Sequence, residues 1–287
     1  MSVQFITAEL RHWILEQVQA GHSPEQVLAA MKTSGWGENL ALQALDETLN
    51  AHLQEKNAAP QEINGLPTPS LVPTPALAGS TPTLWAGDRE VKVLLTLQHP
   101  RVVVFGNLLS DEECDAMRAL AAARLARSET VAESSEGSEV NAARTSDGMF
   151  FERGENALIQ KVEARLAALL DWPLNYGEGL QVLRYRPGAE YLPHFDYFDP
   201  VHAATPAILK RGGQRVATIV MYLNTPEAGG ATTFPDVRLE VSPIKGNAVF
   251  FSYDRPHPMT HTLHGGAPVK AGEKWVATKW LRQGVFT

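Results

Sequence analysis

The sequence predicts a mainly β domain with supporting helices, preceded by a small three-helix bundle. Three observations lead to this prediction. Helical spacing of apolar residues fills the first 56 residues, a proline-rich stretch follows, and strand-like runs dominate after Leu180. The 287 residues exceed one minimal domain, and the composition is ordinary for a globular protein. We therefore divide the chain into residues 1–56, 57–83 and 84–287.

Residues 1–56 carry three segments with helical character. Apolar side chains between Ile6 and Val18 recur at helical spacing, and Leu42, Leu45 and Leu49 do the same within 39–53. Between them, the run Ser23–Gln26 supplies an N-cap, a proline at the first helical position and a capping-box glutamine. A bundle of this size resembles a ubiquitin-associated-like module, which implies a protein partner.

The stretch 57–83 is predicted to be an extended, semi-rigid linker. It is rich in Ala, Thr and Ser, lacks apolar periodicity and contains the prolines Pro60, Pro67, Pro69, Pro73, Pro75 and Pro82. A small bundle on such a tether is typical of a docking device that raises the local concentration of a partner. Packing on the larger domain and self-association are the alternatives.

The larger domain begins with helices and continues with strands. Apolar spacing predicts helices over 111–127, with Ser110 as N-cap, and over 155–170. β-branched and apolar runs predict strands over 215–223 and 247–253, separated by turns at 229–230 and 243–246. The helices are expected to pack on one sheet as supports.

A His-x-Asp pair, His194 and Asp196, ends an extended aromatic-rich run that begins at Tyr191. Side chains two apart on a strand share a face, so both can approach one metal ion. With a later histidine they make a set of two imidazoles and one carboxylate. This set leaves coordination positions open and is typical of non-haem Fe(II) oxygenases.

Two histidines compete to complete this set, His261 and His264. A spacing of three places them on opposite faces of a strand, so only one can be the ligand. We choose His264, because Gly265-Gly266 and Pro268 are expected to turn the chain there and Lys274 then begins a returning strand. On that strand Lys274 and Trp280 share a face. A compact ammonium there suits the distal carboxylate of a dicarboxylic acid.

These motifs resemble the catalytic domain of the prolyl 4-hydroxylases, a family of Fe(II)- and 2-oxoglutarate-dependent dioxygenases. The resemblance runs from about Arg101 to the C-terminus and follows the family's order: 180–185, Tyr191-x-x-His-Phe-Asp196, 264–269, and Gly272-x-Lys-Trp-x-x-x-Lys-Trp280. It implies a double-stranded β-helix, or jelly-roll. It also implies the following roles: His194, Asp196 and His264 as iron ligands, Lys274 as partner of the 2-oxoglutarate C5 carboxylate, Tyr185 and Thr232 as hydrogen-bonding partners, and Trp280 in the pocket wall.

The implied reaction is hydroxylation of a prolyl residue in a peptide or protein, with release of succinate and CO2. Its cofactors would be Fe(II), 2-oxoglutarate and O2, with ascorbate as reductant. Arg144 is a candidate substrate contact because the family carries a similar Arg-x-Ser segment beside its peptide groove. Tyr197 follows the metal-binding aspartate and is a second candidate, with a place in the core as the alternative.

Three other functions compete with this one. A 2-oxoglutarate-dependent hydroxylase of a free amino acid or small metabolite would use the same chemistry. A cupin-like metal protein, loaded with zinc, would have no need of Lys274. A non-enzymatic sensor or adaptor would leave buried metal ligands as costly unpaired groups.

Composition bounds the partners and the location. The single cysteine, Cys114, excludes an internal disulfide, and its expected role is that of a small buried hydrophobe. The formal net charge of −7 argues against a nucleic-acid partner. The sequence shows no secretion signal and no apolar run of membrane-spanning length, so we expect a cytoplasmic protein without a membrane partner. We therefore do not expect collagen to be the substrate.

Overall fold

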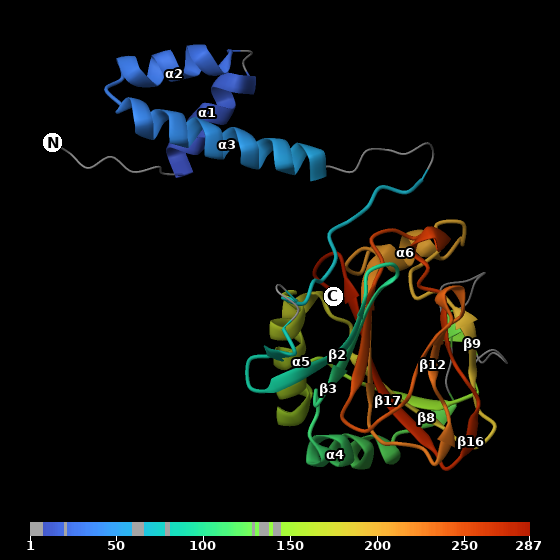
Figure 1. Ribbon diagram of the computed structural model, residues 1–287. Coiled ribbons are helices and arrows are strands. Elements are labelled where there is room, and N and C mark those ends of the chain that lie inside the picture. Colours follow the sequence, from blue (N-terminus) through green and yellow to red (C-terminus); the bar gives the residue numbers. More distant parts are fainter. Residues whose placement is uncertain are drawn as a thin grey trace. The chain divides into compact units, whose positions relative to one another are not determined.

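The structure is a computed structural model and describes residues 8–19, 22–58, 66–77, 81–127, 130–131, 138–139 and 145–287 (Figure 1). The chain divides into two compact units, residues 1–65 and 66–287. Each unit has a hydrophobic core of its own, and each is described here by itself.

The first unit contains the helices α1 (Ala8–Gln19), α2 (Pro24–Thr33) and α3 (Glu38–Ala58). Ser23 caps α2 through the predicted capping box, in which its side chain accepts from Gln26 N and the Gln26 side chain accepts from Ser23 N. The helices enclose a small core made of Leu10, Ile14, Val27, Met31, Ala41, Ala44 and Leu45. None of the described helices in either unit is long and apolar enough to cross a membrane.

The second unit is built on a large antiparallel sheet. Within the described residues its strand order is β1-β2-β3-β14-β10-β17-β8-β7-β4. In this order the strands are β1 (Thr83–Trp85), β2 (Glu90–Leu97), β3 (Arg101–Gly106), β14 (Ala248–Ser252), β10 (Arg215–Tyr222), β17 (Lys274–Arg282), β8 (Leu180–Tyr185), β7 (Asp147–Phe151) and β4 (Ala126–Arg127). The strands predicted over 215–223 and 247–253 are thereby confirmed as β10 and β14.

A smaller sheet faces the large one (Figure 1). Its order is β13 (Leu239–Val241), β12 (Thr232–Phe234), β15 (His264–Gly266) and β9 (Tyr191–His194). Two short pairs complete the β structure: β11 (Ala228–Gly229) with β16 (Val269–Ala271), and β5 (Thr130–Val131) with β6 (Ser138–Glu139). Side chains of the large sheet and of the smaller sheet meet in one core, where the Phe234 and Phe251 rings lie 5.2 Å apart. The expected jelly-roll is therefore confirmed.

Helices cover the outer face of the large sheet (Figure 1). They are α4 (Asp111–Ala122) and α5 (Ala157–Leu170), and a short α6 (Thr205–Leu209) lies in the loop after β9. Ser110 caps α4 through a capping box with Glu113, as predicted for the N-cap, and Asn156 caps α5. The first helix is shorter than the predicted 111–127, because residues 126–127 pair with β7 as the edge strand β4.

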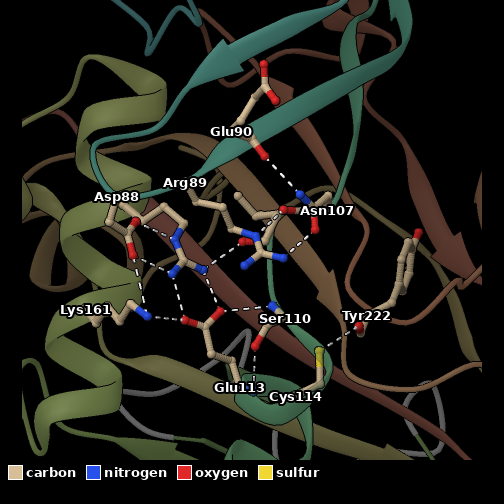
Figure 2. A network of polar contacts seen from close by, with 11 residues as sticks. Asp88, Arg89, Glu90, Asn107, Ser110, Glu113, Cys114, Lys161 and Tyr222 are labelled. Atoms are coloured by element: carbon tan, nitrogen blue, oxygen red, sulfur yellow. Dashed lines mark hydrogen bonds and ion pairs between the residues drawn. The ribbon is translucent and has the colours of Figure 1, made fainter.

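A buried arginine joins α5 to the loops on this outer face. Arg165 is 1% exposed, and its five N–H donors reach Asp88, Glu113 and the Leu108 carbonyl at 2.7–2.8 Å. Lys161 approaches the same two carboxylates, at 3.7 Å from Asp88 and 2.9 Å from Glu113 (Figure 2). Every donor of this buried guanidinium is therefore satisfied, as a stable buried charge requires.

The proline-rich linker is shorter than the predicted 57–83, because residues 66–77, here named the strap, belong to the second unit. Ser70 donates to the Asp254 carbonyl from its backbone N at 2.7 Å and from its hydroxyl at 2.9 Å. Thr74 N donates to the Leu170 carbonyl at 3.1 Å. Leu77 packs against the outer core. Burial of Pro73 and Pro75 and these hydrogen bonds attach the strap to the second unit, which linker composition alone could not indicate.

Candidate active site

Two of the predicted metal ligands face each other across a strand pair. His194 ends β9, and His264 begins β15 directly opposite it, with ring centroids 4.4 Å apart. The predicted turn at Gly265-Gly266 is wrong, since both glycines belong to β15. A Cβ on Gly265 would lie 2.8 Å from the Tyr191 carbonyl oxygen, so a larger residue would push β15 away from β9. Glycine therefore allows the close approach that brings the two imidazoles together.

Asp196 completes the cluster from just beyond the end of β9, rather than from within a strand as predicted. Its carboxylate oxygens lie 3.6 Å from His194 Nε2 and 3.4 Å from His264 Nε2. All three ligand atoms lie within 4.8 Å of one another. His264 and Asp196 are buried, whereas the His194 side chain is 22% exposed and leaves the cluster open on one side.

Backbone carbonyls orient both imidazoles toward the centre of the cluster. His194 Nδ1 lies 2.9 Å from the Leu192 carbonyl, and His264 Nδ1 lies 3.0 Å from the Thr262 carbonyl. A carbonyl can only accept, so each Nδ1 carries the proton and donates it. Each Nε2 is then unprotonated and directs its lone pair toward Asp196, which is the tautomer that a metal-binding histidine needs.

The charges of the cluster suit a cation. Burial alone would raise the pKa of Asp196, but His264, His194 and Arg215 hold it well below its usual range. Burial lowers the pKa of His264 to about 4, against the opposing pull of Asp196. At neutral pH the buried part of the cluster is thus a carboxylate beside a neutral imidazole, a donor set that a divalent metal fits.

Further side chains hold Asp196 in place. Thr218 on β10 donates to Asp196 Oδ2 at 2.7 Å, and Tyr253 Oη lies 2.9 Å from the Thr218 hydroxyl. Arg215 donates to the Asp196 carbonyl at 3.4 Å, while its guanidinium sits over the rings of Trp280 and Phe198 and binds Glu178 through two N–H groups.

A buried lysine lines the same cavity as the metal cluster. Lys274, the first residue of β17, is 4% exposed, and burial lowers its pKa to about 8. In the described part of the chain, no hydrogen bond or ion pair joins its ammonium to another residue. Its ammonium instead lies 5.4 Å from the Tyr185 ring centroid and 5.9 Å from that of Tyr222. A buried, uncompensated cation is costly, so the site is suited to an anion.

The other predicted pocket residues surround this lysine. Tyr185, Thr232, Trp280, the metal cluster and Lys274 all line one cavity. Thr232 accepts a hydrogen bond from Tyr222 at 2.8 Å, which leaves its own hydroxyl proton to donate into the cavity. The indole Nε1 of Trp280 is buried without a partner in the described residues. The cavity therefore offers donors to an anionic ligand along its length.

Three other residues considered in the sequence analysis, the rival metal ligand His261 and the candidate substrate contacts Tyr197 and Arg144, are not among the described residues that line this cavity. His261 is not on a strand: it follows the 3-10 turn η3 (Pro258–Thr260) in a left-handed conformation, and its ring lies 4.9 Å from His99. Tyr197 is 7% exposed and stacks on Phe195 in the core, outside the cavity lining, which matches the alternative role given above. Arg144 lies outside the described residues.

The residues that support Asp196, namely Thr218, Tyr253 and Arg215, were not predicted from the sequence. Thr218 and Tyr222 lie on one face of the predicted strand 215–223. Strict alternation along this strand could therefore have identified Thr218 as a residue that faces the site. Arg215 could not be found in this way, because the pairing of β10 with β17 shifts register between Arg215 and Ala217. Such a bulge re-aims a side chain without a sequence signal.

Comparison with known proteins gives consistent matches. Residues 180–282 match the sequence model of the 2OG-Fe(II) oxygenase superfamily. Prolyl 4-hydroxylase 5 of Arabidopsis thaliana is 38% identical over 217 residues, which cover 68% of this chain and 72% of that protein. Prolyl 4-hydroxylase 1 of the same plant is 39% identical over 226 residues, covering 69% and 77%. The fold is similar to that of a viral collagen prolyl hydroxylase from Paramecium bursaria Chlorella virus-1 in its 2OG complex, with 31% identity, a TM-score of 0.50, and coverage of 63% of this chain and 95% of that one.

Proposed function

The chain belongs to the prolyl 4-hydroxylase family of Fe(II)- and 2-oxoglutarate-dependent dioxygenases, and on this premise we propose that it hydroxylates a prolyl residue within a peptide or protein. The observation that carries the proposal is one cavity lined both by the His-Asp-His cluster, which can hold a metal, and by the uncompensated cation Lys274, which can hold a carboxylate. An α-keto acid with a distal carboxylate suits both, and neither alone would select it.

His194, Asp196 and His264 would hold the iron. When bound, Fe(II) supplies the activation of O2 that the protein's own side chains lack. The protein contributes the fixed tautomers of both imidazoles, the ionised Asp196 and its support by Thr218. These features present three ligands without rearrangement, which favours tight and correctly placed metal binding.

Lys274 would bind the C5 carboxylate of 2-oxoglutarate, with the Thr232 hydroxyl and the Tyr185 phenol as further donors. The ammonium gains the counter-charge that it lacks in the described residues, and burial in a low-dielectric cavity strengthens the interaction. The reaction consumes 2-oxoglutarate and O2 and yields succinate and CO2 together with the hydroxylated proline. We include ascorbate as the reductant that keeps the iron in its ferrous state.

The relatives named as prolyl hydroxylases support a proline-containing peptide or protein as the substrate. We also propose that the first unit, residues 1–65, is a docking module of the ubiquitin-associated type for a protein partner. Its helices α1 to α3 enclose their own core, so it has the structure of an independent module. A cytoplasmic location is part of the same proposal.

The decisive assay incubates the purified, Fe(II)-loaded chain with 2-oxoglutarate and a library of proline-containing peptides. We expect peptide-stimulated succinate formation and a gain of one oxygen atom on proline, read by mass spectrometry. Turnover that only free amino acids or small metabolites stimulate would replace the peptide substrate by a small one. Absence of turnover with iron bound would contradict an enzymatic role.

The ligand assignment has a matched pair of variants, His264→Ala and His261→Ala. The first should abolish turnover and tight metal binding, because it removes a buried ligand of the cluster. The second should leave both unchanged, because His261 contacts His99 and lies outside the cluster. Metal content after dialysis and succinate formation measure the two effects. Retained activity in His264→Ala with loss in His261→Ala would overturn the assignment.

A further inference from the structure

The strap contains a short repeat of the residue type on which the enzyme is proposed to act. Leu66-Pro67-Thr68-Pro69 is followed, two residues later, by Val72-Pro73-Thr74-Pro75. Proline-threonine-proline segments are extended and expose ring C–H bonds, because proline fixes φ and removes a backbone donor. The chain therefore carries proline-rich peptide sequence within its own catalytic unit.

The two copies of the repeat are held differently. In the second copy Pro73 and Pro75 are buried, and the intervening Thr74 N donates to the Leu170 carbonyl at 3.1 Å. In the first copy Pro67 and Pro69 are only partly buried. Next to them, Ser70 supplies two hydrogen bonds to a single acceptor, the Asp254 carbonyl. Two such bonds at a partly exposed site contribute about 1–3 kcal/mol, so local release of the first copy is inexpensive.

A chain of contacts links the attachment point of the first copy to the metal cluster. Asp254 follows Tyr253, whose hydroxyl lies 2.9 Å from that of Thr218, and Thr218 donates to Asp196 at 2.7 Å. One tyrosine side chain and a few hydrogen bonds thus separate Ser70 from a metal ligand. A cavity of about 280 Å³ lies beside the strap at this point, lined by Val72, Tyr253 and Asp254 among others. The strap therefore borders this cavity where it passes Asp254.

The chain between the two copies allows the first copy to move while the second stays bound. Six residues separate Pro67 from the buried Pro73, and six extended residues span about 20 Å. On the other side, Leu66 begins the second unit and is preceded by chain that belongs to the first. A segment tethered in this way has a raised effective concentration at the site, because its encounter with the site is intramolecular.

We propose that the enzyme hydroxylates its own strap, at Pro67 or Pro69, within the same molecule. This inference rests on the proposed prolyl hydroxylation and names one substrate for it. A ring C–H bond becomes C–OH with one atom of O2, the other atom enters succinate, and 2-oxoglutarate supplies the electrons by losing CO2. The buried second copy, Pro73 and Pro75, stays unmodified.

The test uses the full chain and its own internal control. Trypsin releases residues 57–89 as one peptide, because no lysine or arginine lies between Lys56 and Arg89. After incubation with Fe(II), 2-oxoglutarate and O2, we expect this peptide to gain one oxygen atom, which fragment ions assign to Pro67 or Pro69. A gain on Pro73 or Pro75, or on any other proline of the peptide, overturns the proposal.

A second arm tests whether the reaction is intramolecular. The active chain is mixed with an isotopically labelled His194→Ala chain, whose strap is intact but whose metal cluster is not. We expect modification of the unlabelled strap only, at a rate independent of protein concentration. Equal modification of both chains would show that the reaction occurs between molecules and would overturn the proposal.

The same mixture, supplied with the peptide library, separates the two claims. Hydroxylated library peptides with an unmodified strap overturn the self-hydroxylation and leave the proposed function standing. Failure of both strap and library peptides to gain oxygen contradicts the proposed function as well.

Discussion

Two buried cations in the second unit, Arg165 and Lys274, differ in how their charge is compensated. Arg165 is 1% exposed and donates five hydrogen bonds, four of them to the carboxylates of Asp88 and Glu113. Lys274 is 4% exposed, and its ammonium has no hydrogen bond or ion pair with any other residue that the structure describes. Burial opposes both charges, yet the pKa of Arg165 is raised by its carboxylates, whereas that of Lys274 falls to about 8.

The difference separates a charge that stabilises the fold from one that binds a ligand. A fully paired buried arginine ties α5 to the loop before β2 and to α4, and it needs nothing from outside. An unpaired buried lysine weakens the free protein and regains that free energy only when an anion arrives. Burial alone would not distinguish the two residues, but their partners do.

The largest expected effect comes from removing the paired cation. Arg165→Met leaves Glu113 buried with Lys161 as its one remaining charged partner among the described residues, so the free energy of unfolding should fall by about 3–5 kcal/mol. Denaturant unfolding measures it. The control Arg186→Met removes an exposed arginine paired with Asp147 and should cost less than about 1 kcal/mol. A loss of equal size in both variants would remove the basis for the comparison.

Removing the unpaired cation should have the opposite effect on stability. In Lys274→Met the cost of the buried ammonium disappears. Because its pKa falls from 10.5 to about 8, the gain at neutral pH is at most about 3 kcal/mol. The same change should weaken 2-oxoglutarate binding by roughly 10- to 100-fold, the contribution of a charged hydrogen bond.

Calorimetric titration with 2-oxoglutarate and thermal unfolding give the two readouts for this variant. Lys270→Met, at an exposed lysine of β16, serves as the control and should change neither. If Lys274→Met lost stability as Arg165→Met does, Lys274 would have a partner in the protein.

The smallest effect is the pH dependence of the same lysine. Between pH 8 and 10.5 the unfolded chain holds the Lys274 proton and the free folded protein does not, so this group makes stability rise with pH. The affinity for 2-oxoglutarate should fall over the same range, approaching tenfold per pH unit above about 8. An affinity that stays constant from pH 7 to 9, or an equal pH dependence in Lys274→Met, would contradict the role of the ammonium.

Local sequence signals predicted the helices, the strands and the main site residues. Contacts between residues far apart in the sequence could not be predicted from such signals. The capping boxes at Ser23 and Ser110 depend on neighbours three residues apart and were predictable. The Arg165 network joins residues up to 77 positions apart, and no local pattern indicates it. For the same reason the docking of the strap on Asp254 and Leu170 was missed.

The site itself shows the same limit. The face shared by Lys274 and Trp280 depends on strand periodicity, which the sequence displays. Asp196 lies just beyond the end of β9, so its place beside His194 does not follow from that periodicity. The choice of His264 over His261 gave the residue that joins the cluster. However, His261 does not lie on a strand, and the turn expected at Gly265-Gly266 was wrong. His261 lies after a 3-10 turn, a conformation that its sequence does not distinguish from an extended one.

The imidazoles of the metal cluster and Lys274 belong to different sheets. The imidazoles come from β9 and β15 of the smaller sheet, while Lys274 comes from β17 of the large one. A ligand that contacts both the metal cluster and Lys274 would link the two sheets to each other. Binding of 2-oxoglutarate in the cavity should therefore slow amide hydrogen exchange in β9 and β15 at least as much as in β17. The co-substrate would then also stabilise the fold of the enzyme that consumes it.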